Sequence, residues 1–172
     1  MTRRWLTILL LLVMITAFVG GYLATRPTRR IELEHTPVPH EPIMISDDRE
    51  FTAVGAESGC ACVRKGSGSE QDPYVISGWV LNATERVNAV TVFRTTVHFT
   101  VSQVVIWGDQ LSTGIYFERV ENARIEHSRI TGNFVGVYAY LSRDVVFVNN
   151  TVDNGDFGIK LQASNDNVVS SN

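Results

Sequence analysis

The segments Gly114–Phe117 (GIYF), Gly136–Ala139 (GVYA) and Gly158–Leu161 (GIKL) share one pattern and start 22 residues apart. Later positions keep the same register: Ile125, Phe147 and Val169 coincide, as do Ser128, Asn150 and Asn172. A looser copy, with about three extra residues, runs from Ala89 to Ile106. A fixed period of about 20–50 residues without a helical pattern is typical of a solenoid.

Each repeat is expected to contain three short strands. Apolar and polar residues alternate in Gly114–Phe117, Arg124–Glu126 and Arg129–Thr131, which is the two-residue period of a strand. Turns between strands need residues that tolerate left-handed backbone geometry, and the candidates are Asn122, Asn133, Asn154 and Gly155. The L-x-x-L-x-L spacing of leucine-rich repeats is absent. The sequence therefore predicts an all-β fold, a parallel β-helix with three strands in each coil of about 22 residues.

One corner of the coil is expected to carry a ladder of stacked polar side chains. Asn150 and Asn172 occupy equivalent positions, and Ser128 stands there in the preceding coil. Stacked amides can hydrogen-bond along the axis of such a fold. The sequence ends at this ladder position, so we expect that it is an N-terminal fragment and that further coils follow.

A targeting segment is expected at the beginning of the chain. Residues 5–24 carry no charge, and twenty apolar residues at about 1.5 Å each cross roughly 30 Å of hydrocarbon. We expect a transmembrane signal anchor, with a signal peptide cleaved near residues 19–21 as the alternative. The proline-rich residues 25–42 are expected to form a stiff spacer. Residues 43–88 should hold an N-terminal cap and the first coil, and residues 89–172 the repeats.

The charge distribution argues against nucleic acid as a partner. The first 30 residues hold five of the 15 basic residues and no acidic one, so the remainder carries 10 basic residues against 18 acidic ones. Binding to phosphates needs a clustered basic face. We expect the membrane, and polysaccharide or other components of the cell envelope, as partners.

Cys60 and Cys62 are the two cysteines of the chain. One interpretation is a metal or redox pair, with His35, His40 and Met44 as further ligands. A disulfide across a single residue is strained, however, and the other ligands are far away in sequence. We favour the alternative of two small residues near a glycine turn, and expect no metal site and no cofactor.

The stretch Gly66–Trp79 (GSGSEQDPYVISGW) precedes the repeats. Pro73 should set a turn before a strand at residues 74–76, and Trp79 should cover the exposed end of the core. This stretch resembles the GSGT-x-x-DPY-x-I-x-GW motif of archaeal and bacterial surface proteins in the NosD-like group, named for the copper-accessory protein of nitrous-oxide reductase. The repeats also resemble the coils of that group, and the likeness covers roughly residues 43–172.

The resemblance implies a right-handed, extracytoplasmic β-helix. The wider set includes carbohydrate-binding and sugar-hydrolase relatives, so it implies architecture more firmly than activity. A copper-accessory role belongs to one branch of the group. No cluster rich in Met or His accompanies the motifs here.

One outer face of the predicted helix carries candidate ligand-binding residues. The outward positions of the first strand of each coil are Tyr116, Tyr138 and Lys160, followed two residues later by Glu118, Tyr140 and Gln162. Aromatic rings, an amide, a carboxylate and an ammonium group on one face can stack sugar rings and bind their hydroxyls. The alternative is that tyrosine is simply a good strand residue.

Catalysis is not expected from the residues present. Glycoside hydrolysis generally needs two carboxylates on one face, and only Glu118 lies there. Catalytic coils of a glycoside hydrolase or polysaccharide lyase beyond residue 172 are the alternative. His127 shares the position of Asn149, which favours stacking at a turn. Asn82 heads a glycosylation motif, Asn82–Thr84, that we place in a polar loop.

Overall fold

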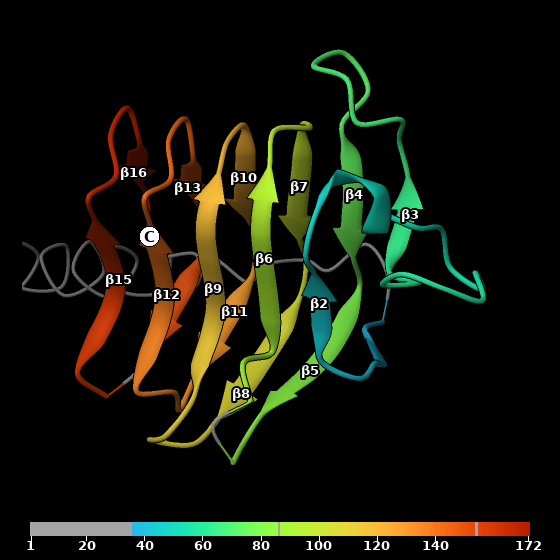
Figure 1. Cartoon of the computed structure of the whole chain (residues 1–172). Helices are drawn as coiled ribbons and strands as arrows, with labels where there is room; N and C mark the ends of the chain where they lie inside the picture. Colours follow the sequence, from blue (N-terminus) through green and yellow to red (C-terminus); the bar gives the residue numbers. More distant parts are fainter. Residues whose placement is uncertain (1–35, 86, 154) are drawn as a thin grey trace, which may run out of the picture. The chain divides into compact units, whose positions relative to one another are not determined.

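The strands of the chain form three sheets around one apolar core (Figure 1). The computed structural model describes residues 36–85, 87–153 and 155–172. Sheet 1 contains, in spatial order, β1 (Val38–Pro39), β5 (Trp79–Ala83), β8 (Val105–Gly108), β11 (Arg129–Thr131) and β14 (Thr151–Asp153). Sheet 2 contains β16 (Val168–Ser170), β13 (Val146–Val148), β10 (Ala123–Glu126), β7 (Phe99–Ser102), β4 (Tyr74–Ser77) and β3 (Val63–Lys65). Sheet 3 contains β15 (Phe157–Gln162), β12 (Val135–Tyr140), β9 (Thr113–Val120), β6 (Val90–Thr95) and β2 (Ile43–Ile45).

The 22-residue repeat of the sequence corresponds to one coil of the structure. Ile125 pairs with Phe147 and Phe147 with Val169, so residues 22 apart lie on neighbouring parallel strands. The looser copy joins the same stack, because Val90 pairs with Ile115. The inward residues of successive coils thus bury one another, and the prediction of an all-β, parallel solenoid with three strands per coil is confirmed.

Each coil turns its corners through left-handed residues at repeated positions. One row of positive φ angles runs through Arg119 (53°), Leu141 (51°) and Ala163 (49°), and another through Asn122 (58°), Asp144 (54°) and Asp166 (55°). The expectation that glycine and asparagine mark the turns holds at Asn122, is wrong at Asn133, where the neighbouring Gly132 is left-handed (81°), and misses the first row. In that row three residues other than glycine and asparagine adopt the left-handed conformation in successive coils.

The predicted polar ladder is present. The Ser128 amide donates to Oδ1 of Asn150 at 3.1 Å, and the Asn150 amide donates to Oδ1 of Asn172 at 3.0 Å. Asn150 Nδ2 also donates to Asn172 Oδ1 at 2.8 Å. These bonds join three successive coils along one corner.

The N-terminal end of the stack is covered by segments that do not follow the repeat. β3 is the one antiparallel strand among those described, and it pairs with β4. The 3₁₀ helix η1 (Asp48–Glu50) is fastened to the coil by hydrogen bonds from Thr95 and Thr96 to Asp48. Trp79 is 5% exposed, and its Nε1 donates to the Cys62 carbonyl at 3.0 Å. The tryptophan was predicted to cover this end itself, but it is buried, with β1 paired beside it and Arg64 over its ring.

The N-terminal helix predicted at residues 5–24 lies outside the described ranges. Within those ranges no helix has the length and apolarity needed to span a bilayer. β1 falls inside the stretch expected to be spacer, where it pairs with β5.

Candidate functional site

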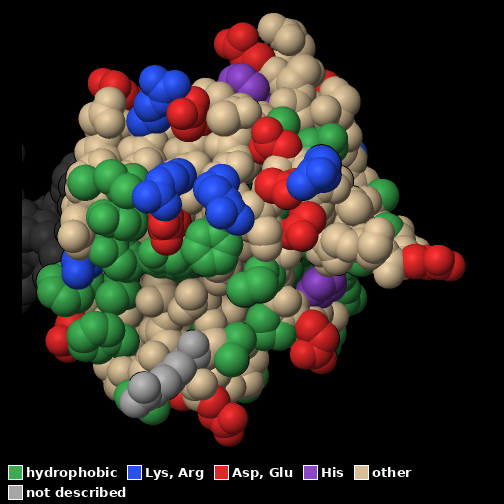
Figure 2. Space-filling view, in the orientation of Figure 1, with side chains coloured by type: hydrophobic (Ala, Val, Ile, Leu, Met, Phe, Trp, Pro, Cys, Tyr) green, Lys and Arg blue, Asp and Glu red, His purple; other side chains and the backbone are tan. Residues whose placement is uncertain are grey.

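The six residues predicted to form a binding face lie together on the outer side of sheet 3. Parallel pairing places Tyr138 between Tyr116 and Lys160, and Tyr140 between Glu118 and Gln162. We call this group of six the tyrosine face. In Figure 2 hydrophobic side chains, tyrosine among them, gather over the part of the sheet that contains β9, β12 and β15. Neighbouring strands lie about 4.8 Å apart, so the two rows form a compact surface across three coils.

Ring contacts connect the aromatic members of the tyrosine face. The centroids of Tyr116 and Tyr138 are 5.4 Å apart in an edge-to-face arrangement, and those of Tyr138 and Tyr140 are 6.4 Å apart. Such pairs hold aromatic rings in defined orientations. The Lys160 ammonium lies 4.8 Å from the Tyr138 ring centroid, within the range of a cation–π contact.

Polar contacts fix the hydroxyl groups of two tyrosines. Tyr116 donates to Glu118 Oε2 at 3.0 Å, and Tyr138 donates to Gln162 Oε1 at 2.6 Å. Burial and the hydrogen bond to Glu118 together raise the pKa of Tyr116 to about 12. The phenol is therefore neutral at physiological pH and acts as a donor. Arg119 forms an ion pair with the other oxygen of Glu118, so both carboxylate oxygens have partners.

Three phenylalanines extend the aromatic surface and were not predicted. Phe93 pairs with Glu118 across the strands and contacts the Tyr116 ring at 5.9 Å. Phe157 lies under the Lys160 ammonium, 5.2 Å from it, and packs against Phe134. Phe93 precedes Glu118 by the 25-residue spacing of the looser repeat, so that spacing was the signal that could have located it.

Other predicted positions have structural surroundings. The two cysteines form a disulfide, Cys60–Cys62, contrary to the expectation that strain would prevent a bridge across one residue. His127 occupies a left-handed corner, and its Nε2 lies 3.4 Å from Nδ2 of Asn149, as expected for stacking at a turn. Asn82 lies in strand β5 and not in a loop, and its Oδ1 is buried without a hydrogen-bond partner. The sequence suggested a loop because the polar motif Asn82–Thr84 interrupts a short run of apolar residues.

A family described as "Periplasmic copper-binding protein (NosD)" matches residues 61–172, which is more than half of the chain. The chain belongs to the NosD family. No curated protein and no solved structure matches it. The description of the NosD family as periplasmic supports the expected extracytoplasmic location of this NosD-family domain.

The residues that the structure describes do not fit a copper site. Within them no three side chains of His, Cys, Asp or Glu come close enough together to hold a metal ion. Copper in such sites is bound by thiolates, thioethers or imidazoles. Both cysteine sulfurs of this NosD-family chain are joined in the disulfide, which leaves no thiolate for a metal.

Proposed function

We propose that this NosD-family chain is a membrane-anchored, extracytoplasmic β-helix module that binds saccharide on the tyrosine face. The observation that carries the proposal is the alignment of Tyr116 and Tyr138 on neighbouring strands, 5.4 Å apart, beside an amide, a carboxylate and an ammonium group. Apolar ring surface with a few oriented polar groups is the usual composition of a small-molecule site.

The polar groups on this face are arranged to receive hydroxyls. The Tyr140 hydroxyl has no hydrogen-bond partner among the described residues, so it is available to a ligand. Gln162 has only its oxygen engaged by Tyr138, which leaves its two N–H donors to face solvent. A sugar that packs on the rings would meet both a donor and an acceptor within one strand spacing.

Binding without turnover is favoured by the carboxylates. Hydrolysis of a glycosidic bond uses an acid and a second carboxylate about 5–10 Å away. Within the two outward rows of β9, β12 and β15, Glu118 is the single carboxylate, and both its oxygens are engaged by Tyr116 and Arg119. The face therefore has the composition of a binding surface.

The test is retention of the purified full chain on immobilised cell-envelope polysaccharides. The double substitution Tyr116→Ala, Tyr138→Ala removes both rings. Retention should fall at least about tenfold, because aromatic side chains that pack against a ligand contribute much of the binding free energy. No reducing sugar should appear in the unbound fraction. Retention of the double variant at the wild-type level would overturn the proposal, as would release of sugar.

Trp107→Ala provides the matched control. Trp107 is an exposed aromatic residue, 49% accessible, on the outer side of β8 in sheet 1, away from the tyrosine face. Its loss removes a comparable apolar area from another sheet, so retention should remain within about twofold of wild type. Thermal unfolding of each variant separates lost binding from lost folding.

A further inference from the structure

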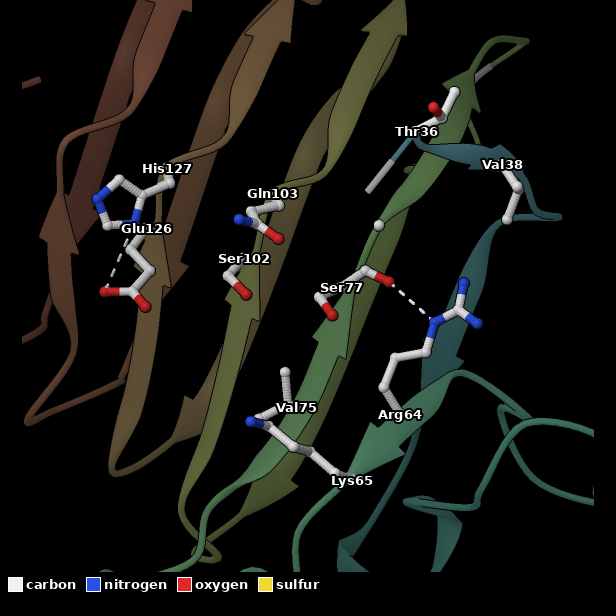
Figure 3. A pocket seen from close by; sticks show the side chains of 11 residues that line it. Thr36, Val38, Arg64, Lys65, Val75, Ser77, Ser102, Gln103, Glu126 and His127 are labelled. Atoms are coloured by element: carbon white, nitrogen blue, oxygen red, sulfur yellow. Dashed lines mark hydrogen bonds and ion pairs between the residues drawn. The ribbon is translucent and has the colours of Figure 1, made fainter. Parts of the chain in front are cut away.

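A groove lined by both polar and apolar residues runs across the outer side of sheet 2, a different sheet from the one that carries the tyrosine face (Figure 3). Its volume is about 610 Å³, which lies within the range of ordinary ligand sites. It is lined by side chains of β3, β4, β7 and β10 and by the segment before β1. We call it the sheet 2 groove.

The floor of the sheet 2 groove is a row of hydrogen-bonding side chains. Ser77, Ser102 and Glu126 occupy one register across β4, β7 and β10, so their side chains follow one another at about 4.8 Å. Gln103 and His127 come next along their strands, both in the left-handed conformation. The backbone N–H and C=O groups of these central strands are hydrogen-bonded to neighbouring strands on both sides. A ligand in the groove must therefore be bound by side chains.

One end of the groove carries two cations without a carboxylate partner. The Arg64 guanidinium lies 3.6 Å from the Trp79 ring centroid, and its Nε donates to the Ser77 carbonyl at 3.1 Å. These two contacts fix the group and leave its terminal nitrogens free. Lys65 is exposed on the next position and makes no ion pair with any described residue.

Arg64 and Lys65 differ from most arginines of the described residues. Four of those arginines form ion pairs with carboxylates: Arg49, Arg119, Arg124 and Arg143. Arg64 and Lys65 form none, so their charges face the groove without a carboxylate partner among the described residues. A planar guanidinium and an ammonium group are each well suited to a carboxylate or sulfate.

The acidic residue of the groove, Glu126, lies too far from β3 to repel an anion bound there. Glu126 is paired with Arg124 at 2.5 Å, and His127 Nδ1 lies 4.0 Å from the same oxygen. β3 and β10 are separated by three strand spacings, which is about 14 Å. The groove therefore offers an anion subsite at β3 and neutral hydrogen-bonding groups along β4 and β7.

We propose that the sheet 2 groove binds a short acidic oligosaccharide. Its carboxylate or sulfate groups would lie against Arg64 and Lys65, which line the groove at β3 and extend in different directions (Figure 3), and its hydroxyls would bond to Ser77, Ser102 and Gln103. An acidic peptide fits less well, because extended peptides bind by pairing with a strand edge and the floor here is a sheet face. This site is independent of the tyrosine face, since it lies on another sheet.

The test is calorimetric titration of the purified full chain with trigalacturonate, a sulfated trisaccharide and uncharged galactotriose. The acidic ligands should bind at least about tenfold more tightly than galactotriose, and added salt should weaken them. The stronger of the carboxylated and sulfated ligands identifies the anion. Equal affinity for galactotriose, or no binding of either acidic ligand, would overturn the proposal.

Lys65→Glu places a carboxylate in the anion subsite and should weaken trigalacturonate at least about tenfold. Arg129→Glu is the matched control, because it makes the same change in net charge at an exposed residue on the outer side of sheet 1. It should change affinity by less than about twofold. An equal loss in both variants would show nonspecific attraction and refute the site, and an unaffected Lys65→Glu would do the same.

Two further variants keep the result interpretable. Lys65→Ala removes the cation without adding charge and should give an intermediate loss in a protein of unchanged thermal stability. The double substitution Tyr116→Ala, Tyr138→Ala should leave trigalacturonate affinity unchanged. If it abolishes that affinity, the acidic ligand binds on the tyrosine face and the sheet 2 groove is excluded.

Discussion

Replacement of Asn150 by alanine tests whether the polar ladder holds successive coils together. Asn150 is 5% exposed, and its side chain makes three hydrogen bonds. Its Oδ1 accepts from the Ser128 amide at 3.1 Å, and its Nδ2 donates to the Ile125 carbonyl at 3.0 Å and to Asn172 Oδ1 at 2.8 Å. The substitution removes all three bonds.

The expected loss follows from the groups left behind. Ser128 and Ile125 are both fully buried, so their backbone groups cannot turn to water. A buried group deprived of its partner costs about 1–3 kcal/mol, and two such groups give a loss of about 2–4 kcal/mol in the free energy of unfolding. Urea denaturation of the full chain measures the loss, and hydrogen exchange at the Ser128 amide should accelerate.

Two variants make the measurement decisive. Asn165→Ala removes an exposed amide whose bond is to Asp166 on the surface, and it should stay within about 0.5 kcal/mol of wild type. Asn150→Ser should recover part of the loss, because Ser128 fills the same corner one coil earlier and accepts from the Val104 amide at 3.3 Å. If Asn150→Ala is as stable as Asn165→Ala, the ladder contributes nothing and the reasoning fails.

Asp48→Asn should cost about 1 kcal/mol near neutral pH by weakening the bonds from Thr95 that fasten η1. Burial raises the pKa of Asp48, but its hydrogen bonds outweigh burial and hold the pKa below the usual value. The difference from wild type in urea denaturation should therefore begin to shrink as pH falls below about 4, and should vanish once the pH is below the lowered pKa of Asp48. The phenolate absorbance phase near pH 12 should disappear in Tyr116→Phe; a persisting phase would assign it elsewhere. Gly114→Ala should destabilise by about 1–3 kcal/mol, because its Cβ would lie 2.6 Å from a neighbouring carbonyl, whereas Gly158→Ala, with nothing nearer than 3.8 Å, should unfold at the wild-type urea concentration.

The repeated part of the fold could be predicted because equivalent positions in every coil have the same surroundings and therefore need the same type of residue. Inward positions such as Ile125 and Phe147 must be apolar, since each is buried by its equivalent in the next coil. The outward rows follow by alternation, which is why the sequence alone predicts that Tyr116 and Tyr138 lie on one face. Periodicity thus located both the core and the tyrosine face.

The non-repeated part could not be predicted by the same means. The Cys60–Cys62 bridge depends on a local backbone path that has no counterpart in another coil. Strand β3 pairs with β4 in antiparallel orientation and with a register shift, so no repeat spacing in the sequence predicts this pairing. Arg64 and His127 line one groove although 63 positions separate them, and neither belongs to a shared motif.

The difference between the repeated and the non-repeated parts of the fold also determines where a ligand can be recognised specifically. A strict repeat places similar groups at intervals of about 4.8 Å, and so it produces rows such as Ser77 and Ser102 that offer the same chemistry at every step. Distinguishing a charged ligand from a neutral one needs a group that occurs once. Arg64 and Lys65 supply it because β3 enters the sheet against the direction of every other strand in it. The change from repeat to cap therefore creates the charge asymmetry that a uniform stack of coils lacks.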